Sequence, residues 1–246
     1  MSDRPVRDVL AEQLRERLLF LRDSGISDLA TRPKVVTSAG ASLSAAGVVQ
    51  AFDAAPPDPS QALAGLQAEI GDCTRCRLSE RRTRLVFGTG NPQARLMFVG
   101  EGPGYEEDRQ GLPFVGKAGQ LLNRIIQAMG MRREEVYIAN VVKCRPPENR
   151  TPLPDECETC LPFLLRQIEI IRPQVICALG SVAVGALLQT SGSISRLRGT
   201  LRSLADGTAV MPTFHPAYLL RNPEKKKEVW EDMKIVMDFL ARHPRA

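Results

Sequence analysis

The sequence predicts an α/β protein with a mostly parallel sheet, because short apolar runs alternate along the chain with segments of helical periodicity. A sheet of this kind binds its ligands beyond the carboxyl ends of the strands. The expected strands are residues 95–99, 136–142, 174–179 and 208–213, with residues 85–88 as a further candidate. The expected helices are residues 117–129, 155–171, 181–188 and 223–240.

The strand at residues 174–179 and the helix after it lie in the longest uncharged stretch of the chain, residues 173–195. The apolar part of this stretch, residues 175–188, is interrupted by Gly180, Ser181 and Gly185. It is also shorter than the ~20 residues that a membrane span requires. We therefore expect a buried strand followed by a helix, and no membrane segment.

The final helix carries the clearest local signals. Asn222 is the expected N-cap, and Pro223 occupies the first helical position. Six apolar residues then share one face: Val229, Trp230, Met233, Val236, Met237 and Leu240.

Composition limits the class of protein. Of the 246 residues, 43% are hydrophobic and 25% are charged, which excludes wholesale disorder. The net charge of +5 is compatible with nucleic-acid binding, although many ordinary solvated surfaces have the same charge. The N-terminus lacks the layout of a secretory signal, so we expect a soluble, cytoplasmic protein.

The first 60 residues differ from the rest. Residues 8–22 repeat apolar side chains at helical spacing, which predicts an amphipathic helix. Residues 31–60 are rich in Ala, Ser, Gly and Pro and predict a flexible linker. We expect residues 1–60 to form this extension and residues 61–246 to form the folded domain.

Three residues with chemical potential lie at or just after the ends of expected strands. Glu101 follows the first strand, Asn140 lies close to the end of the second, and His215 follows the last. In a parallel sheet these positions share one rim, so a carboxylate, an amide and an imidazole meet there. Each residue alone has a simpler interpretation, as a turn carboxylate, a strand-end Asn or a helix-capping His.

Two neighbouring features also allow two interpretations. The glycine-rich segment at residues 100–104 is an ordinary turn, or a place where a ligand approaches the backbone closely. It is not a P-loop, because no Gly-Lys-Ser/Thr follows, and the earlier segment at residues 88–94 is not a dinucleotide fingerprint. Phe114 is a core residue, or a stacking platform for a flat base at the rim of a pocket.

The cysteines are the sharpest signal for a cofactor. The chain contains Cys73, Cys76, Cys144, Cys157, Cys160 and Cys177. Structural disulfides are improbable in an intracellular chain, so clustered thiols indicate a metal. Spacing alone leaves zinc and an iron–sulfur cluster open, whereas Cys177 is expected to be a small buried apolar residue.

Three long motifs, at residues 100–119, 140–150 and 215–223, resemble the family 4 uracil-DNA glycosylases. The likeness extends over about residues 61–240. It implies a three-layer α/β/α sandwich around a short, mostly parallel sheet. It also implies a DNA repair enzyme that flips uracil out of single- or double-stranded DNA and hydrolyses its N-glycosidic bond, leaving an abasic site.

The resemblance further implies a 4Fe-4S cluster, whose ligands are Cys73, Cys76, Cys144 and Cys160. Cys157 lies where the family has no ligand. The cluster is expected to be structural, because hydrolysis transfers no electrons.

The resemblance also implies roles for site residues. Phe114 stacks on uracil and Asn140 reads its edge, with Gly102 in the glycine-rich wall. His215 donates to the leaving oxygen, and Glu101 positions water or stabilises the cationic sugar. Four further residues are expected to contact DNA: Lys117, Arg198 and Arg221 at phosphates, and Leu219 as a wedge in the duplex.

Two departures from the family stand out. Tyr105 replaces a Glu that the family commonly has, and the first 60 residues have no counterpart in minimal members. We expect a prokaryotic monomer with nucleoid-associated activity, whose extension can bind a replication or repair protein. The alternative function is a non-catalytic iron–sulfur module that binds DNA or assists replication on the same fold.

Overall fold

Four parallel strands form the centre of a six-stranded sheet, and a short antiparallel strand borders each edge. The structure is a computed structural model that describes residues 58–244. The strand order is β1-β3-β2-β4-β6-β5. The central strands are β3 (Tyr137–Asn140), β2 (Leu96–Gly100), β4 (Val175–Leu179) and β6 (Ala209–Thr213), and the edges are β1 (Thr89–Gly90) and β5 (Arg202–Ser203).

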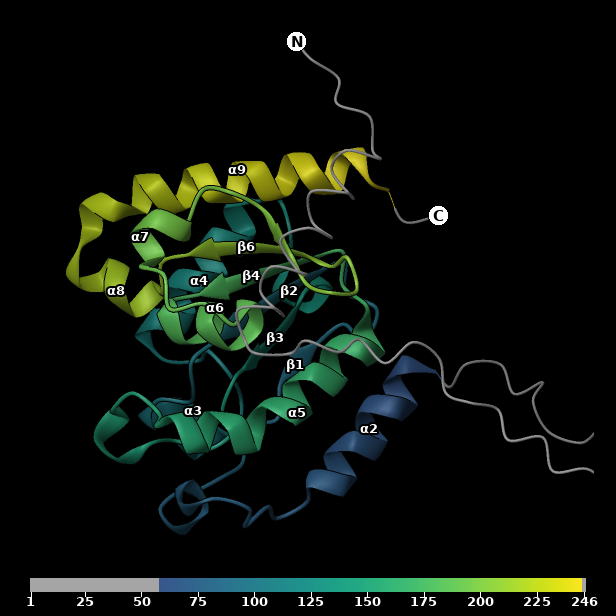
Figure 1. Ribbon diagram of the computed structural model, residues 1–246, viewed down its shortest axis with the longest axis vertical. Coiled ribbons are helices and arrows are strands. Elements are labelled where there is room, and N and C mark those ends of the chain that lie inside the picture. The colour runs from purple at the N-terminus through teal and green to yellow at the C-terminus, as the bar shows by residue number, and fades with distance from the viewer. Residues whose placement is uncertain (1–57, 245–246) are drawn as a thin grey trace, which may run out of the picture. The chain divides into compact units, whose positions relative to one another are not determined.

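Helices cover both faces of this sheet (Figure 1), which confirms the predicted three-layer α/β/α sandwich. On one face lie α4 (Lys117–Ala128), α8 (Pro216–Arg221) and α9 (Lys226–Arg242); on the other lie α2 (Pro59–Ile70), α5 (Pro154–Ile171) and α6 (Ser181–Leu188). The alternation of side chains along β2 explains the two layers. Leu96 and Phe98 belong to the first core, whereas Met97 and Val99 belong to the second.

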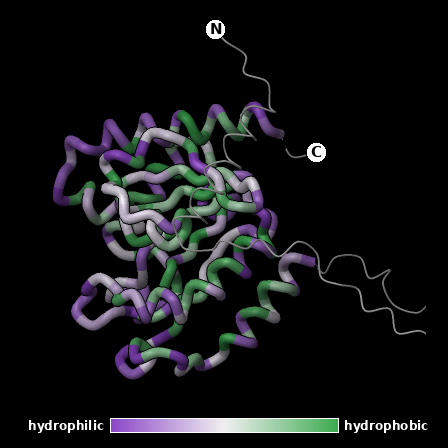
Figure 2. The backbone as a smooth tube through the Cα atoms, viewed as in Figure 1, coloured by the Kyte–Doolittle hydropathy of each residue, from purple (hydrophilic) through white to green (hydrophobic). Residues whose placement is uncertain are grey.

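Apolar residues concentrate along the central strands and on the inward faces of the helices, as the green segments in Figure 2 show. The strands are buried from end to end, in keeping with a parallel sheet that is covered on both sides. Within residues 58–244, no helix combines the length and the apolar character that crossing a membrane requires.

Helix α2 begins inside the segment that the sequence predicts as linker. The Asp58 side chain accepts a hydrogen bond from the backbone N–H of Ser60, and Pro59 occupies the first turn. The helix then lies beside α5 and buries Leu63, Leu66 and Ile70 (Figure 1). The predicted amphipathic helix at residues 8–22 and most of the linker lie outside the described residues.

Several short elements lie in segments for which the sequence predicts no helix. They are α3 (Tyr105–Gln110), α7 (Ile194–Leu197) and the 3-10 turns η1 (Arg77–Glu80), η2 (Arg133–Glu135), η3 (Pro147–Asn149) and η4 (Pro223–Lys225). Each is too short to show a helical period in the sequence.

The structure corrects two details of the predicted elements. Residues 85–88 are not a strand; the backbone N–H of Val86 instead donates to the carbonyl of Lys143. Asn222 does not cap the last helix with its side chain, because its amide donates to the carbonyl of Tyr218. Pro223 consequently opens the turn η4, and α9 starts at Lys226. Trp230, predicted on the apolar face of α9, is 36% exposed.

The register of the sheet brings the strand ends to one rim. Gly100 at the end of β2 pairs with Asn140 at the end of β3, and Leu179 pairs with Thr213 at the end of β6. Glu101, Asn140 and His215 therefore leave the sheet at the same edge.

Candidate active site

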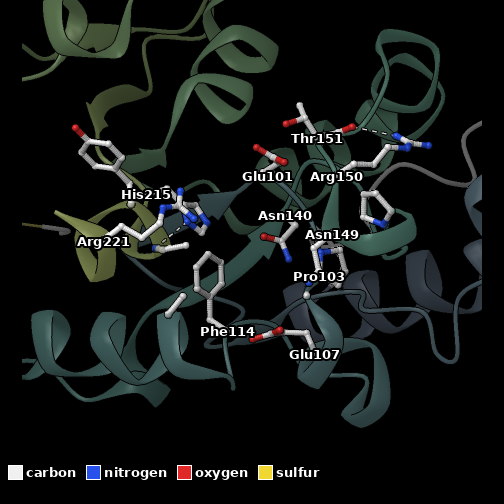
Figure 3. Close-up of a pocket in the computed structure, with 16 residues that line it drawn as sticks. Glu101, Pro103, Glu107, Phe114, Asn140, Asn149, Arg150, Thr151, His215 and Arg221 are labelled. Atoms are coloured by element: carbon white, nitrogen blue, oxygen red, sulfur yellow. Dashed lines mark hydrogen bonds between the residues drawn. The ribbon is translucent and has the colours of Figure 1, made fainter.

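A cavity of about 460 Å³ lies at this rim (Figure 3). Six of the residues singled out in the sequence line it: Glu101, Gly102, Phe114, Asn140, His215 and Arg221. They come from the segments after β2, β3 and β6 and from α8. The structure thus brings residues that are more than 100 positions apart in the chain into one site.

Asn140 is the last residue of β3, and its side chain is buried with only 1% exposure. Its Oδ1 atom has no hydrogen-bond partner within residues 58–244. Leaving a buried carbonyl oxygen without a partner is costly, so its presence beside a cavity indicates a donor supplied by a ligand.

Gly100 makes room for this amide. A Cβ atom at position 100 would lie 2.5 Å from Asn140 Oδ1 and 2.5 Å from Phe114 Cζ. Gly102 plays a similar part in the wall of the cavity, because a Cβ there would lie 2.7 Å from Val142. The glycine-rich segment therefore lets neighbouring side chains pack directly against its backbone.

Phe114 is buried at the cavity, with its ring centroid 5.5 Å from that of His215. Its φ angle is +52°, a conformation that non-glycine residues seldom adopt. Arg133 donates to the carbonyls of Pro113 and Phe114, at 2.5 and 3.2 Å, which helps to hold this backbone. Backbone strain of this kind at a binding site is typical of a side chain that is held in its binding position before the ligand arrives.

Glu107 also holds the Phe114 loop, a role that the sequence did not predict. Its Oε1 atom accepts hydrogen bonds from the backbone N–H groups of Val115 and Gly116, at 2.9 and 2.8 Å. Glu107 lines the cavity from below Phe114 in Figure 3. Its place in the first motif was a signal, but only the folded chain shows which N–H groups it receives.

His215 both caps α8 and faces the cavity, so its two interpretations hold together. Its Nδ1 atom accepts a hydrogen bond from the backbone N–H of Ala217 at 3.1 Å. Burial lowers the pKa of His215 to about 4, so the ring is neutral at pH 7. Because Nδ1 is an acceptor, the single ring proton lies on Nε2, which can donate to a ligand.

Glu101 directly follows β2, and its carboxyl group lies on the other side of Asn140 from the Phe114 ring (Figure 3). Burial raises the pKa of this carboxyl above its usual value. The cavity therefore offers an acid–base group, an amide, an aromatic face and an imidazole donor within one enclosure.

The predicted phosphate ligands have three different environments. Arg221 lies at the cavity and is exposed. Lys117 is exposed at the first residue of α4, next to Ala118, which lines the cavity. Arg198 is instead occupied within the protein, where it pairs with the fully buried Asp232 at 2.7 Å. The prediction that Arg198 contacts phosphate is therefore corrected.

The predicted wedge residue is also corrected. Leu219 is completely buried in the core, beside residues of α4 and α9. Its neighbour Leu220 is 42% exposed. The two leucines are neighbours on α8, and the rotation of this helix decides which of them solvent reaches.

Four cysteines line one small apolar pocket away from the cavity: Cys73, Cys76, Cys144 and Cys160. The first two precede η1, Cys144 follows β3, and Cys160 lies on α5. Cys157 is partly buried one turn earlier on α5 and does not line this thiol pocket, and Cys177 is buried in β4. Within residues 58–244, no three potential ligands are close enough to hold a single metal ion.

The thiol pocket fits an iron–sulfur cluster by its chemistry. N–H groups approach three of the sulfurs: Arg82 donates to Cys144 at 3.2 Å, Arg75 to Cys73 at 3.2 Å, and the backbone of Lys143 to Cys160 at 3.3 Å. Four thiols with N–H donors around them are the environment that such clusters prefer.

Lys143 connects the thiol pocket to the cavity. The sequence did not predict this role. Its side chain is completely buried, and its Nζ atom donates to the Asn140 carbonyl at 2.9 Å and to Gln167 Oε1 at 2.6 Å. Burial lowers its pKa to about 8. The segment from Asn140 to Cys144 is therefore a short internal connection between the amide and the thiols.

Comparison with known proteins finds relatives over most of the described residues. The family model described as the uracil DNA glycosylase superfamily matches residues 87–234. The type-4 uracil-DNA glycosylase of Thermotoga maritima is 51% identical over 176 residues, which cover 70% of this chain and 92% of the relative. The type-4 enzymes of Sulfurisphaera tokodaii and Archaeoglobus fulgidus are 42% and 41% identical, over 71% and 74% of this chain and 83% and 95% of their own lengths.

Proposed function

The chain belongs to the uracil-DNA glycosylase superfamily, and on this premise we propose that it removes uracil from DNA by hydrolysing the N-glycosidic bond. The observation that carries the proposal is the unpartnered amide oxygen of Asn140 beside the Phe114 ring and the His215 imidazole. The product is an abasic site, so the activity belongs to base excision repair.

The cavity can recognise uracil in two ways, through the flat face of the ring and through its hydrogen-bonding edge. The Phe114 ring offers a stacking surface for its face. The Asn140 amide offers an acceptor and a donor in one plane, which match the N3–H and O4 groups of uracil. Cytosine presents the inverse pattern, so it would leave buried polar groups unpaired.

The uracil must leave the base stack to reach Asn140, because that residue is buried at the bottom of the cavity. Flipping a base costs a few kcal/mol, which contacts with the flipped base and the DNA backbone offset. A cavity of about 460 Å³ lies within the usual range for small-ligand sites.

Bond cleavage needs groups at both ends of the breaking bond. As the bond between C1′ and uracil N1 breaks, its electron pair goes to the base, where Nε2–H of neutral His215 donates to the developing oxyanion. Glu101 orients water towards C1′, or stabilises the cationic sugar, from the opposite wall. The water oxygen bonds to C1′ and its proton passes to the carboxylate or to solvent.

We propose that Cys73, Cys76, Cys144 and Cys160 hold a 4Fe-4S cluster. When bound, the cluster cross-links the segment after α2, the loop after β3 and helix α5. Its contribution is structural, because hydrolysis transfers no electrons.

Phosphate contacts are proposed for Arg221 and Lys117, both exposed near the cavity. We also propose that residues 61–246 act as a monomeric catalytic domain in the cytoplasm, and that residues 1–60 are available to a replication or repair partner. The family match within residues 87–234 supports this division, because it lies wholly inside the proposed domain.

The test is release of uracil from a uracil-containing oligonucleotide by the purified holoenzyme. Asn140→Ala and His215→Ala should each lower kcat/KM by at least about 100-fold, because each removes a buried polar contact to the base. Asn91→Ala, in a turn after β1 and outside the cavity, is the matched control. DNA binding without an abasic product would support the non-catalytic module instead.

A further inference from the structure

An exposed aromatic side chain next to the cavity wall has two cations close to its ring. Tyr105 is 49% exposed, more than any other large hydrophobic side chain in the described part of the chain. The guanidinium carbon of Arg145 lies 5.1 Å from its ring centroid, and that of Arg109 lies 5.7 Å away. We call these three residues the Tyr105 patch.

The two guanidinium groups of the patch have no ion-pair partner among residues 58–244. Two acidic residues of α3 are occupied elsewhere: Glu107 accepts from the Phe114 loop, and Asp108 accepts from the backbone N–H of Thr83. Two cations on one ring repel each other unless an anion lies between or beside them. The patch is therefore suited to an anionic partner.

The patch continues the wall of the cavity. Tyr105 directly follows Gly104, and Arg145 directly precedes Pro146; both of these neighbours line the cavity. The Nε atom of Arg145 also donates to Oδ1 of Asn149, another lining residue, at 2.7 Å.

The patch also lies on a different side of the cavity from Arg221. In Figure 3, Asn149 and Pro103 lie on one side of Asn140, whereas Arg221 and His215 lie on the other. A DNA strand that places one base in the cavity has a phosphate on each side of that nucleotide. Arg221 on α8 and Lys117 at the start of α4, the two phosphate ligands proposed above, belong to helices that contact each other. The side of Asn149 and Pro103 has no proposed phosphate contact.

We propose that Tyr105, Arg109 and Arg145 form a subsite for the nucleotide next to the flipped uracil on the same strand. The guanidinium groups bind its phosphodiester, and the stacked planes of the patch receive its base. Stacking on aromatic and guanidinium planes tolerates any base, so the subsite gives affinity without sequence preference. This inference rests on the proposed function and specifies how the strand crosses that site.

The experiment measures the binding of single-stranded oligonucleotides that carry an uncleavable abasic analogue. In one series the analogue is the 5′-terminal nucleotide, in a second the 3′-terminal nucleotide, and in a third it is internal. The wild-type holoenzyme should gain affinity when the nucleotide on the patch side is added. Arg109→Ala and Tyr105→Ala should each reduce that gain by about five- to tenfold.

Charge and stacking can be separated within the same series. Tyr105→Phe should keep the gain, because the ring remains. Tyr105→Glu should abolish it, because a carboxylate beside the two guanidinium groups competes with the phosphodiester for them. Loss of one phosphate contact in Arg145→Ala should reduce the slope of log affinity against log salt by about 0.7.

Arg132→Ala is the matched control, because its exposed guanidinium lies at the opposite end of β3. Iron content is measured for every variant, because Arg145 follows Cys144. The inference is overturned if the wild type gains nothing from either neighbouring nucleotide, or if the patch variants gain as much as the wild type. Failure of the proposed function is a separate result, namely that the wild-type holoenzyme releases no uracil.

Discussion

His215 shows how one side chain can serve the fold and the reaction through different atoms. Its Nδ1 atom caps α8 by accepting from Ala217, which leaves Nε2–H as the donor at the cavity. Protonation would place a second proton on Nδ1, opposite the Ala217 N–H, and would break the cap. The neutral ring is therefore required both by the helix and by the proposed reaction.

The pKa of His215 predicts how stability depends on pH. Its folded-state pKa of about 4 lies below the ordinary value of 6.5, so the unfolded chain binds this proton at higher pH than the folded chain does. The contribution to stability is complete above pH 6.5 and is lost as the pH falls from 6.5 towards 4. Denaturant titrations of wild type and His215→Gln over this range check the prediction, since the variant should lack this part of the pH dependence.

The same titration should appear in catalysis. For the wild type, kcat/KM for uracil release should be level around neutral pH and should fall as the pH approaches 4, where His215 protonates. Burial raises the pKa of the Glu101 carboxyl above its usual value, so this group is a second source of acid dependence and must be separated from His215.

Two variants separate the two groups. Glu101→Gln should be slower but should keep the limb near pH 4, whereas His215→Gln should keep only the limb due to Glu101. An acid limb that disappears in Glu101→Gln and survives unchanged in His215→Gln would assign it to the carboxyl group instead.

At the scale of single elements, the end of β2 and the Phe114 loop form one unit. Strand β2 ends at Gly100, against which both the Asn140 amide and the Phe114 ring rest. The two site residues can approach the strand this closely because position 100 lacks a side chain. A similar close approach occurs at Gly119 in α4, where a Cβ would lie 2.0 Å from the Phe114 carbonyl.

Gly100→Ala should therefore impair uracil release more than stability. The added Cβ displaces the amide and the ring, so kcat/KM should fall by at least about 100-fold, while overpacking costs about 1–3 kcal/mol of unfolding free energy. Single-turnover kinetics and denaturant titrations measure the two effects.

Gly65→Ala provides the control, because no atom lies within 4 Å of a Cβ at that position in α2. It should stabilise the helix by about 0.5–1 kcal/mol and leave uracil release unaffected. If Gly100→Ala retained wild-type turnover, the close packing of Asn140 and Phe114 against β2 would be unnecessary for the reaction.

A second link between elements joins β6, the segment after α7 and helix α9. Asp232 of α9 is completely buried and receives hydrogen bonds from Arg198 and from Thr213 Oγ1, the latter at 2.5 Å. Burial raises the pKa of Asp232, and Thr213 and Arg198 partly oppose this effect. Since Thr213 ends β6 two residues before His215, this link steadies the backbone that leads into the site.

Arg198→Leu should destabilise the protein by about 3 kcal/mol, because it leaves the buried Asp232 without its cation. The salt dependence of DNA binding should stay as in the wild type, because Arg198 is not free to contact phosphate. Arg221→Ala should show the reverse: little change in stability and a salt slope smaller by about 0.7–0.9. A reduced salt slope in Arg198→Leu would restore its role as a phosphate ligand.

At the scale of the whole molecule, the thiol pocket lies where three separate segments meet. It is formed by the segment after α2, the loop after β3 and helix α5, which are distant in the chain. Lys143 connects this pocket to Asn140 through its buried side chain. A cluster bound in the thiol pocket should therefore affect both the packing of α2 against α5 and the position of the Asn140 amide.

Removal of the metal tests this connection. The holoenzyme should contain iron and acid-labile sulfide in equal amounts, and their removal should lower Tm by roughly 10 °C or more, because three segments lose their common cross-link. Cys160→Ser should behave like the metal-free protein.

Cys157→Ser is the matched control, since Cys157 lies one turn earlier on α5 and does not line the thiol pocket. It should keep the iron content of the wild type. Bound zinc without iron, or a Tm that is insensitive to metal removal, would contradict the proposed structural cluster.

The sequence by itself determined the order and type of the long elements from β2 onward, though not helix α2, and placed Glu101, Asn140 and His215 at strand ends. These features are local, because apolar periodicity, proline and glycine positions and strand-end motifs depend on neighbouring residues. The motifs therefore identified the cavity wall before its geometry was known.

Only the tertiary structure decided which side chains are free. In the folded chain Leu219 is buried and Leu220 is exposed. Arg198 forms an ion pair with Asp232, and Glu107 accepts hydrogen bonds from the Phe114 loop. Each of these outcomes depends on partners that are brought together by packing of distant segments, and no local pattern encodes them. The rotation of a helix against the sheet and the pairing of buried charges are properties of the assembled core.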